Sequence, residues 1–146
     1  MRLGGVEVAT GIHLTGHSDG DAVAHALTDA LLGAAAAGDI GAMFPDTDEN
    51  NRGRNSMEML RAAVALIGRR GFTVVNADVT VIAEKPKIGP YRDLICASLA
   101  ESLGTGAGDV SVKGKTNEGM GWIGSGKGLA CIAVATIASK TEAGGE

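Results

Sequence analysis

Two histidines, a serine and two aspartates are concentrated near the beginning of the chain. His17, Ser18, Asp19 and Asp21 lie within five residues, and His25 follows four residues after Asp21. A neutral imidazole can bind a metal ion, and an imidazole N–H can donate a hydrogen bond to a phosphate oxygen. The stretch therefore predicts metal or phosphate chemistry. The alternative is a capped surface helix with solvated acids and one partly packed histidine.

This stretch is expected to lead into a helix that starts at Ala22 and ends at Gly33. Apolar residues recur at helical spacing on the side expected to face the core, at Val23, Leu27, Ala30 and Ala34. The opposite side is expected to carry Asp21, His25 and Thr28. Ser18 or Asp19 is predicted to cap the first turn, whose free N–H groups and dipole favour a bound anion.

A long loop rich in acidic residues, from Gly38 to Gly53, follows this helix. Loops of this length in small domains are usually functional or mobile. Its Pro-Asp and Asn-Asn pairs are also ordinary turn chemistry, and a run of acids is usually a solvated surface. A ligand-binding loop and a solvated turn region therefore both remain open.

The second half of the chain alternates between helical and extended periods. Asn55 and Glu58 form a capping box for a second helix that ends at Gly71, and Pro90 is expected to begin a third helix. One side of the third helix is expected to carry Tyr91, Leu94, Ile95, Ser98 and Leu99. Strands are predicted over 72–83, 110–116 and 129–139. The first of them has a predicted buried face of Val75, Ala77, Val79, Val81 and Ala83. This order predicts an α+β domain with helices on one side of a sheet.

Length and composition suit one compact domain. The chain has 146 residues, of which 45% are hydrophobic, enough to bury one core but not two. Residues 1–146 are therefore expected to form a single domain, with about 141–146 as a frayed tail. The 23 glycines stand against one Trp, one Tyr and two Phe, so the aromatic core is small. Partner subunits are expected to cover part of the surface.

Charge and hydropathy argue against two classes of partner. The net charge is −4 and no basic cluster exceeds two residues, which argues against nucleic acid as a partner. No apolar run approaches the ~20 residues of a membrane helix. Cys96 and Cys131 lack metal-type spacing and are expected to be free thiols in a reducing compartment. A cytoplasmic protein is expected.

A glycine-rich segment, Gly121 to Gly128, nearly matches the phosphate loop of nucleotide hydrolases. The Ser or Thr that should follow Lys127 is missing, and with it the magnesium ligand of that motif. The run that follows is also a better strand than helix. A nucleotide hydrolase is therefore a distant alternative.

Several segments together carry a resemblance that spans almost the whole chain. They are Leu3–Val6, Gly16–Asp21 with His25, Gly38–Gly41, Phe44–Asp48, Lys85–Lys87, and Lys113 with Thr116, Glu118 and Gly121. In this order they resemble the 2-C-methyl-D-erythritol 2,4-cyclodiphosphate synthase family of non-mevalonate isoprenoid biosynthesis. The resemblance implies a lyase-type intramolecular phosphoryl transfer. Its substrate is 4-diphosphocytidyl-2-C-methyl-D-erythritol 2-phosphate, and its products are the 2,4-cyclodiphosphate and CMP.

The resemblance also implies residue roles. His25 resembles the zinc-binding histidine, Glu118 the carboxylate that holds Mg²⁺ or Mn²⁺, and His17 and Thr116 the pair that clamps the transition state. Positions around the methylerythritol are matched by Ser18, Asp39, Gly41 and Asp46, and other substrate contacts by His17, Ile40, Phe44, Pro45, Thr47 and Asp48. The cytidine pocket is matched by Ala83, Lys87, Ile88, Gly89, Lys115 and Thr116, and the remaining substrate contacts by Asn117, Glu118, Trp122 and Ser125. Family members are homotrimers with sites between subunits.

Two departures from the family pattern bear on the metal and on the trimer cavity. The family begins with a strand bearing an Asp-x-His pair, which supplies two of three zinc ligands, and this chain starts after that point. His25 is then left alone, since His13 lies where the family usually has glycine, and an incomplete zinc site is expected. Ser125 and Lys127 replace the usual arginine and glutamate of the central trimer cavity. A catalytically weak, zinc-deficient relative that binds cytidine nucleotides is the alternative function.

Overall fold

The sheet at the centre of the molecule has three strands in the order β4-β3-β5. The computed structural model describes residues 1–9 and 18–140. The central strand β3 (Phe72–Ile82) pairs in parallel with β4 (Val110–Lys115) and antiparallel with β5 (Ala130–Ser139). The predicted α+β class is confirmed, with a mixed sheet.

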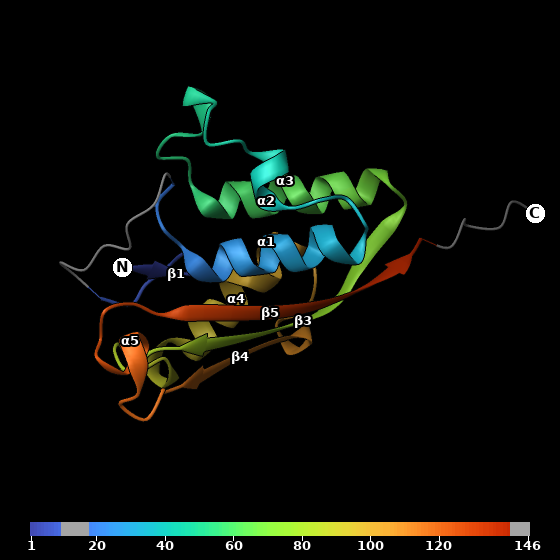
Figure 1. Cartoon of the computed structure of the whole chain (residues 1–146). Coiled ribbons are helices and arrows are strands. Elements are labelled where there is room, and N and C mark those ends of the chain that lie inside the picture. The colour runs from blue at the N-terminus through green and yellow to red at the C-terminus, as the bar shows by residue number, and fades with distance from the viewer. Residues whose placement is uncertain (10–17, 141–146) are drawn as a thin grey trace, which may run out of the picture.

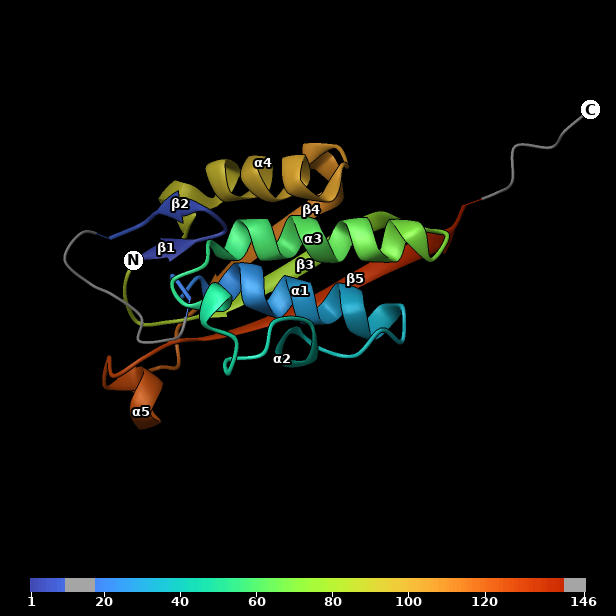
Figure 2. The ribbon, with the colours of Figure 1, turned by 90° about the horizontal axis from the view of Figure 1, so that it is seen from above.

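Three long helices cover one face of this sheet (Figures 1 and 2). They are α1 (Ala22–Ala34), α3 (Ser56–Arg69) and α4 (Arg92–Leu103). Helix α1 packs on β5 and β3, α3 packs on α1, and α4 packs on β4. Shorter elements are the hairpin β1 (Arg2–Leu3) and β2 (Val6–Glu7), the one-turn helices α2 (Ile40–Met43) and α5 (Gly121–Gly124), and 3₁₀ turns Glu49–Asn51, Gly89–Tyr91 and Ala107–Asp109. No helix in the described ranges is both long and apolar enough to cross a membrane.

The cap of α1 differs from the predicted one. Neither Ser18 nor Asp19 caps this helix. Asp21 does, because its carboxylate accepts the Ala24 N–H at 3.0 Å. Asp21 is 1% exposed, whereas the sequence pattern placed it on the outer side. The same carboxylate accepts the N–H groups of Gly4 and Gly5 at 2.8 and 2.7 Å, so it ties the β1–β2 turn to the start of α1.

The buried side of α1 is also rotated from the prediction. Thr28 is fully buried and donates its hydroxyl to the Ala24 carbonyl at 2.8 Å, while Ala34 is exposed. The apolar positions that decide the rotation are Val23, Ala24, Leu27, Leu31 and Leu32, all of them buried. A hydroxyl that donates a hydrogen bond to a carbonyl of its own helix can be buried without leaving an unsatisfied polar group. A hydropathy pattern counts Thr as polar and therefore does not predict this burial.

Two further predictions about local structure are corrected. Val75 is 45% exposed because the pairing of β3 with β5 shifts register between Val74 and Asn76, which changes the face that alternate residues occupy. Pro90 lies in a 3₁₀ turn, and α4 begins at Arg92. Leu94 on that helix is 61% exposed, whereas Ile95 and Leu99 are fully buried as predicted.

Candidate active site

Two hydroxyl groups, one from the segment before α1 and one from α3, contact the His25 ring. His25 Nε2 lies 2.9 Å from Ser18 Oγ and 2.8 Å from Ser56 Oγ. Ser56, the first residue of α3, donates its hydroxyl to the Asp19 carboxylate, which also accepts the Ser56 N–H at 3.2 Å. Ser18 and His25, predicted separately as a substrate contact and a zinc ligand, therefore lie together beside Ser56, which the sequence pattern did not single out.

The hydrogen bonds around His25 place its Nε2 against two hydroxyl groups. Ser56 donates its hydroxyl proton to the Asp19 carboxylate, so Ser56 Oγ can accept from Nε2 in the tautomer that carries the proton there. In that tautomer Nδ1 is the unprotonated ring nitrogen. Within residues 1–9 and 18–140 no group of three or more His, Cys, Asp or Glu side chains could hold a metal ion. The described residues alone do not make a zinc site.

A cavity of about 590 Å³ opens beside His25. Six residues carried over from the family line it together with His25: Ser18, Ile40, Gly41, Phe44, Asp46 and Thr47. Four lining residues were not predicted: Glu49, Asn51, Arg52 and Met59. The loop that walls this cavity is braced by Asn51, whose Nδ2 donates to the Pro45 carbonyl at 2.8 Å, and by Arg54, whose guanidinium lies 4.9 Å from the Phe44 ring centre.

Two of the predicted acidic contacts make backbone hydrogen bonds of their own. Asp39 caps α2 by accepting the Ala42 N–H at 2.7 Å, and Asp48 accepts the Asn50 N–H at 3.0 Å at the next turn. Neither of them lines the cavity, nor does Pro45. The acidic loop thus combines turn chemistry with a ligand-sized cavity, and both interpretations of its sequence apply to different residues.

A second cavity, of about 300 Å³, lies where β3 and β4 end. It is lined by all six residues matched to the cytidine pocket: Ala83, Lys87, Ile88, Gly89, Lys115 and Thr116. Gly114 also lines it, and a Cβ there would lie 2.9 Å from Ile88 Cβ, so a larger residue would have to displace Ile88. The expected cytidine segments, 83–89 and 114–116, include Gly114 and Pro86, whereas Pro90 and Arg92 were not predicted. Parallel strands bring their carboxyl ends to one edge, which explains why two distant segments meet here.

The residue pair Thr116 and Glu118 lies in the loop after β4. Thr116 Oγ1 donates to Glu118 Oε1 at 3.1 Å, and the Glu118 side chain is exposed. An exposed carboxylate beside a hydroxyl is a donor set that fits a hard divalent cation whose remaining ligands are phosphate oxygens and water.

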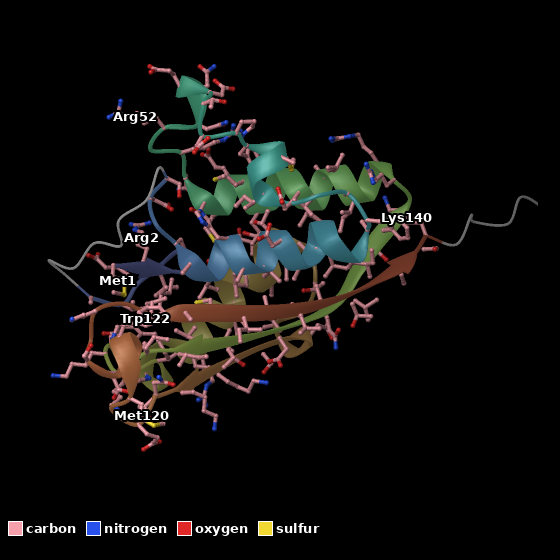
Figure 3. The ribbon with its side chains drawn as sticks, in the orientation of Figure 1. Met1, Arg2, Arg52, Met120, Trp122 and Lys140 are labelled. Atoms are coloured by element: carbon pink, nitrogen blue, oxygen red, sulfur yellow. The ribbon has the colours of Figure 1, made fainter. Side chains whose placement is uncertain are left out.

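The remaining predicted site residues lie elsewhere. Trp122 and Ser125, in and just after α5, line neither cavity, and Ser125 Oγ donates to the Trp122 carbonyl at 3.1 Å. Figure 3 shows Trp122 and Met120 by α5 near the end of the sheet, whereas Arg52 of the first cavity lies beyond the helices. His13 and His17 fall outside the described residues. The nucleotide-hydrolase alternative is not supported, because the glycine-rich segment leads into strand β5 and not into a helix.

Neither cysteine is built for nucleophilic chemistry. Burial, with a smaller contribution from the negative charge of Asp21, raises the pKa of Cys131 to about 12. Burial also raises the pKa of Cys96. Both thiols are free, in agreement with the prediction.

The fold and the two cavities define a small α+β ligand-binding domain. The first cavity is lined by a histidine, hydroxyl groups and acidic side chains, and the second by two lysines and by the backbone of two glycines. A Thr–Glu pair suited to a divalent cation lies at the end of the strand that borders the second cavity. These features together define an enzyme domain for a phosphorylated substrate.

Comparison with known proteins identifies the family. The chain belongs to the YgbB family, whose model matches residues 1–138. It is 57% identical over 137 residues to 2-C-methyl-D-erythritol 2,4-cyclodiphosphate synthase of Gemmatimonas aurantiaca, which covers 94% of this chain and 82% of that protein. A synthase from Dechloromonas aromatica is 50% identical over 135 residues, covering 92% and 84%.

Two solved structures show the same fold. The CDP complex of IspF from Plasmodium falciparum aligns with a TM-score of 0.84 and 37% identity, covering 95% of this chain and 83% of that one. The bifunctional IspDF from Campylobacter jejuni aligns with a TM-score of 0.92 and 37% identity, covering 95% of this chain and 38% of that longer chain. The family resemblance inferred from the motifs is confirmed.

Proposed function

We propose that this chain is a phosphorus–oxygen lyase that converts 4-diphosphocytidyl-2-C-methyl-D-erythritol 2-phosphate to 2-C-methyl-D-erythritol 2,4-cyclodiphosphate and CMP. The 2-phosphate oxygen of the substrate attacks the phosphorus that bears the methylerythritol, and the bond from that phosphorus to the CMP oxygen breaks. The observation that carries the proposal is the second cavity, lined by the six residues matched to the cytidine pocket, in a chain 57% identical to a named synthase.

The residues of the chain contribute mainly binding and charge neutralisation. The lysine side chains at Lys87 and Lys115 supply positive charge beside the nucleotide cavity. We assign Thr116 and His17 as donors to phosphoryl oxygens that gain charge during transfer, and Ser18 and Asp46 to the methylerythritol end. Phosphoryl transfer needs such positioning and electrostatic stabilisation more than covalent chemistry.

Two metal roles are proposed with different support. Glu118, with Thr116 beside it, would hold Mg²⁺ or Mn²⁺ on the diphosphate, which neutralises developing charge. His25 is proposed as a zinc ligand, but the described residues supply no further ligands around it. Zinc would bind an unprotonated nitrogen of this ring, and its Nε2 already lies within hydrogen-bond distance of the Ser18 and Ser56 hydroxyls. We therefore expect weak zinc binding by residues 1–146.

We propose a homotrimer with each site formed between two subunits. In each site, the first cavity of one subunit would bind the methylerythritol end of the substrate. The second cavity of the neighbouring subunit would bind the cytidine end. The two cavities have no lining residue in common among those described. The uncovered face of the sheet carries Ile132 and Val134, which are 59% and 64% exposed, as expected of residues that pack against another subunit. We also propose a cytoplasmic location, because free thiols such as these two persist in a reducing compartment.

Two measurements test the function. The first is release of CMP and of the cyclic product from the cytidine substrate, with zinc and magnesium content measured on the same sample. The second is calorimetry, in which CDP and CMP should bind more tightly than the adenine and uracil nucleotides, because a wrong base leaves buried polar groups unpaired. CDP binding without turnover would favour the catalytically weak relative. Equal binding of all nucleotides would contradict the assignment of the cytidine cavity.

A further inference from the structure

Glu84 makes two backbone hydrogen bonds that join the segments on either side of the second cavity. Glu84 is the second residue after the end of β3, and the residue before it, Ala83, lines that cavity. Its Oε1 accepts the Asn117 N–H at 2.8 Å and the Gly119 N–H at 3.3 Å. The two donors are the residues immediately before and after Glu118, 33 and 35 positions along the chain from Glu84.

The backbone held by Glu84 is in an uncommon conformation. Glu118 has φ of 51° and Gly119 has φ of 74°, both in the left-handed region. Glycine adopts this region freely, but a residue with a side chain such as Glu118 does so only when its surroundings compensate. Backbone N–H groups in such a turn converge and attract an anion. The Glu84 carboxylate supplies that anion from within the protein.

Two other contacts limit where this loop can go. The Asn117 side-chain amide donates to the Met120 carbonyl at 2.7 Å, which closes the turn on its far side. A Cβ added at Gly124 of α5 would lie 2.1 Å from the Gly119 carbonyl carbon, so α5 packs directly on the loop backbone. The loop is therefore braced by α5 on one side and by Glu84 on the side of β3.

We propose that Glu84 is a positioning residue that holds Glu118 and Thr116 in place for the divalent cation and thereby couples cation binding to nucleotide binding. The proposal rests on the proposed function of the second cavity and of Glu118. One carboxylate thus connects the segment that lines the nucleotide cavity with the Asn117–Gly119 turn that carries Glu118. Such supporting hydrogen bonds behind a metal ligand commonly change metal affinity by ~10-fold to 100-fold when they are lost.

Three variants separate positioning from direct coordination. Glu84→Ala removes the acceptor. Glu84→Gln keeps an amide oxygen that can accept both N–H groups but removes the charge. Glu101→Ala is the matched control, because it removes an exposed carboxylate from α4. If Glu84 instead bound the cation itself, the neutral Gln variant would lose affinity much as the Ala variant does.

Hydrogen exchange tests the positioning without reference to function. In the intact protein we expect Glu84→Ala to raise the exchange rate of the Asn117 backbone amide by about 10-fold or more. The reason is that this amide loses its hydrogen bond to Glu84 Oε1. Glu84→Gln and Glu101→Ala should stay within about threefold of the unchanged protein. An unchanged Asn117 exchange rate in Glu84→Ala would overturn the positioning role.

Calorimetry with CDP tests the coupling. The ratio of the CDP dissociation constants in EDTA and in Mn²⁺ reports how strongly the cation assists binding. We expect Glu84→Ala to lower this ratio by about 10-fold or more while leaving the value in EDTA within about twofold, and Glu84→Gln to restore the ratio. If Glu84→Ala lost CDP affinity equally in EDTA and in Mn²⁺, the coupling would be overturned. Failure of Glu84→Gln to restore the ratio would also overturn it. If the unchanged protein bound no CDP, the proposed function would fail, while the exchange data would still decide the role of Glu84.

Discussion

Replacing Asp21 with alanine should remove the connection between the N-terminal hairpin and α1. Asp21 Oδ1 accepts from Gly4 and Ala24, and Oδ2 accepts from Gly5. Loss of an N-cap costs ~1 kcal/mol. Each hydrogen bond from a glycine N–H to a charged acceptor contributes ~1.5 kcal/mol at the low end of its range, which suits the partly buried Gly5. The expected loss of unfolding free energy is therefore about 4 kcal/mol.

Urea denaturation followed by circular dichroism measures this loss, at one fixed protein concentration because oligomers gain apparent stability from association. In thermal unfolding the same loss corresponds to about 10 °C. Asp21→Asn should lose about half as much, since its amide oxygen keeps the Gly4 and Ala24 bonds while its NH₂ group faces the Gly5 N–H. The control is Asp29→Ala, which loses one exposed bond to the Ile40 N–H. A loss below about 1 kcal/mol for Asp21→Ala, or one equal to that of Asp29→Ala, would refute the reasoning.

Three further outcomes are expected. Thr116→Val should lower kcat by about 100-fold and change CDP affinity in EDTA by less than about threefold, because its hydroxyl acts on charge that develops during transfer; equal losses of both would contradict this role. Gly114→Ala should weaken CDP binding by about 10-fold, since the new Cβ displaces Ile88 into the cavity, whereas Gly108→Ala, with open space at its Cβ, should bind CDP normally in the same calorimetric titration. Cys131, with its pKa raised to about 12, should react with a thiol reagent at pH 8 far more slowly in the folded than in the urea-unfolded protein, and equal rates would contradict its burial.

The parts of the fold that follow from short-range patterns were predicted well. Asn55 was predicted to cap α3, and its Oδ1 accepts the Met57 and Glu58 N–H groups. The alternation over Leu129–Ser139 predicted β5, although a buried helix has the same apolar content. In each case the signal lies within a few residues along the chain, where helix and strand periods apply.

The parts that were wrong depend on contacts distant in sequence. Asp21 is buried because Gly4 and Gly5, 17 and 16 positions away, supply N–H groups to its carboxylate, and no local pattern reveals such partners. The exposure of Val75 depends on a register shift against β5, which lies more than fifty residues later.

The residues of the second cavity came from the family resemblance, and the structure supplies the physical reason for their grouping. Six residues from two segments meet because β3 and β4 are parallel neighbours that end at the same edge. The ligand-facing loops are then fitted to each other by glycines, with Gly114 under Ile88 and Gly124 under Gly119. The chain has few aromatic residues with which to position such loops. Close backbone approach does so here, and substitutions at these two glycines should therefore disturb ligand binding more than removal of an exposed side chain does.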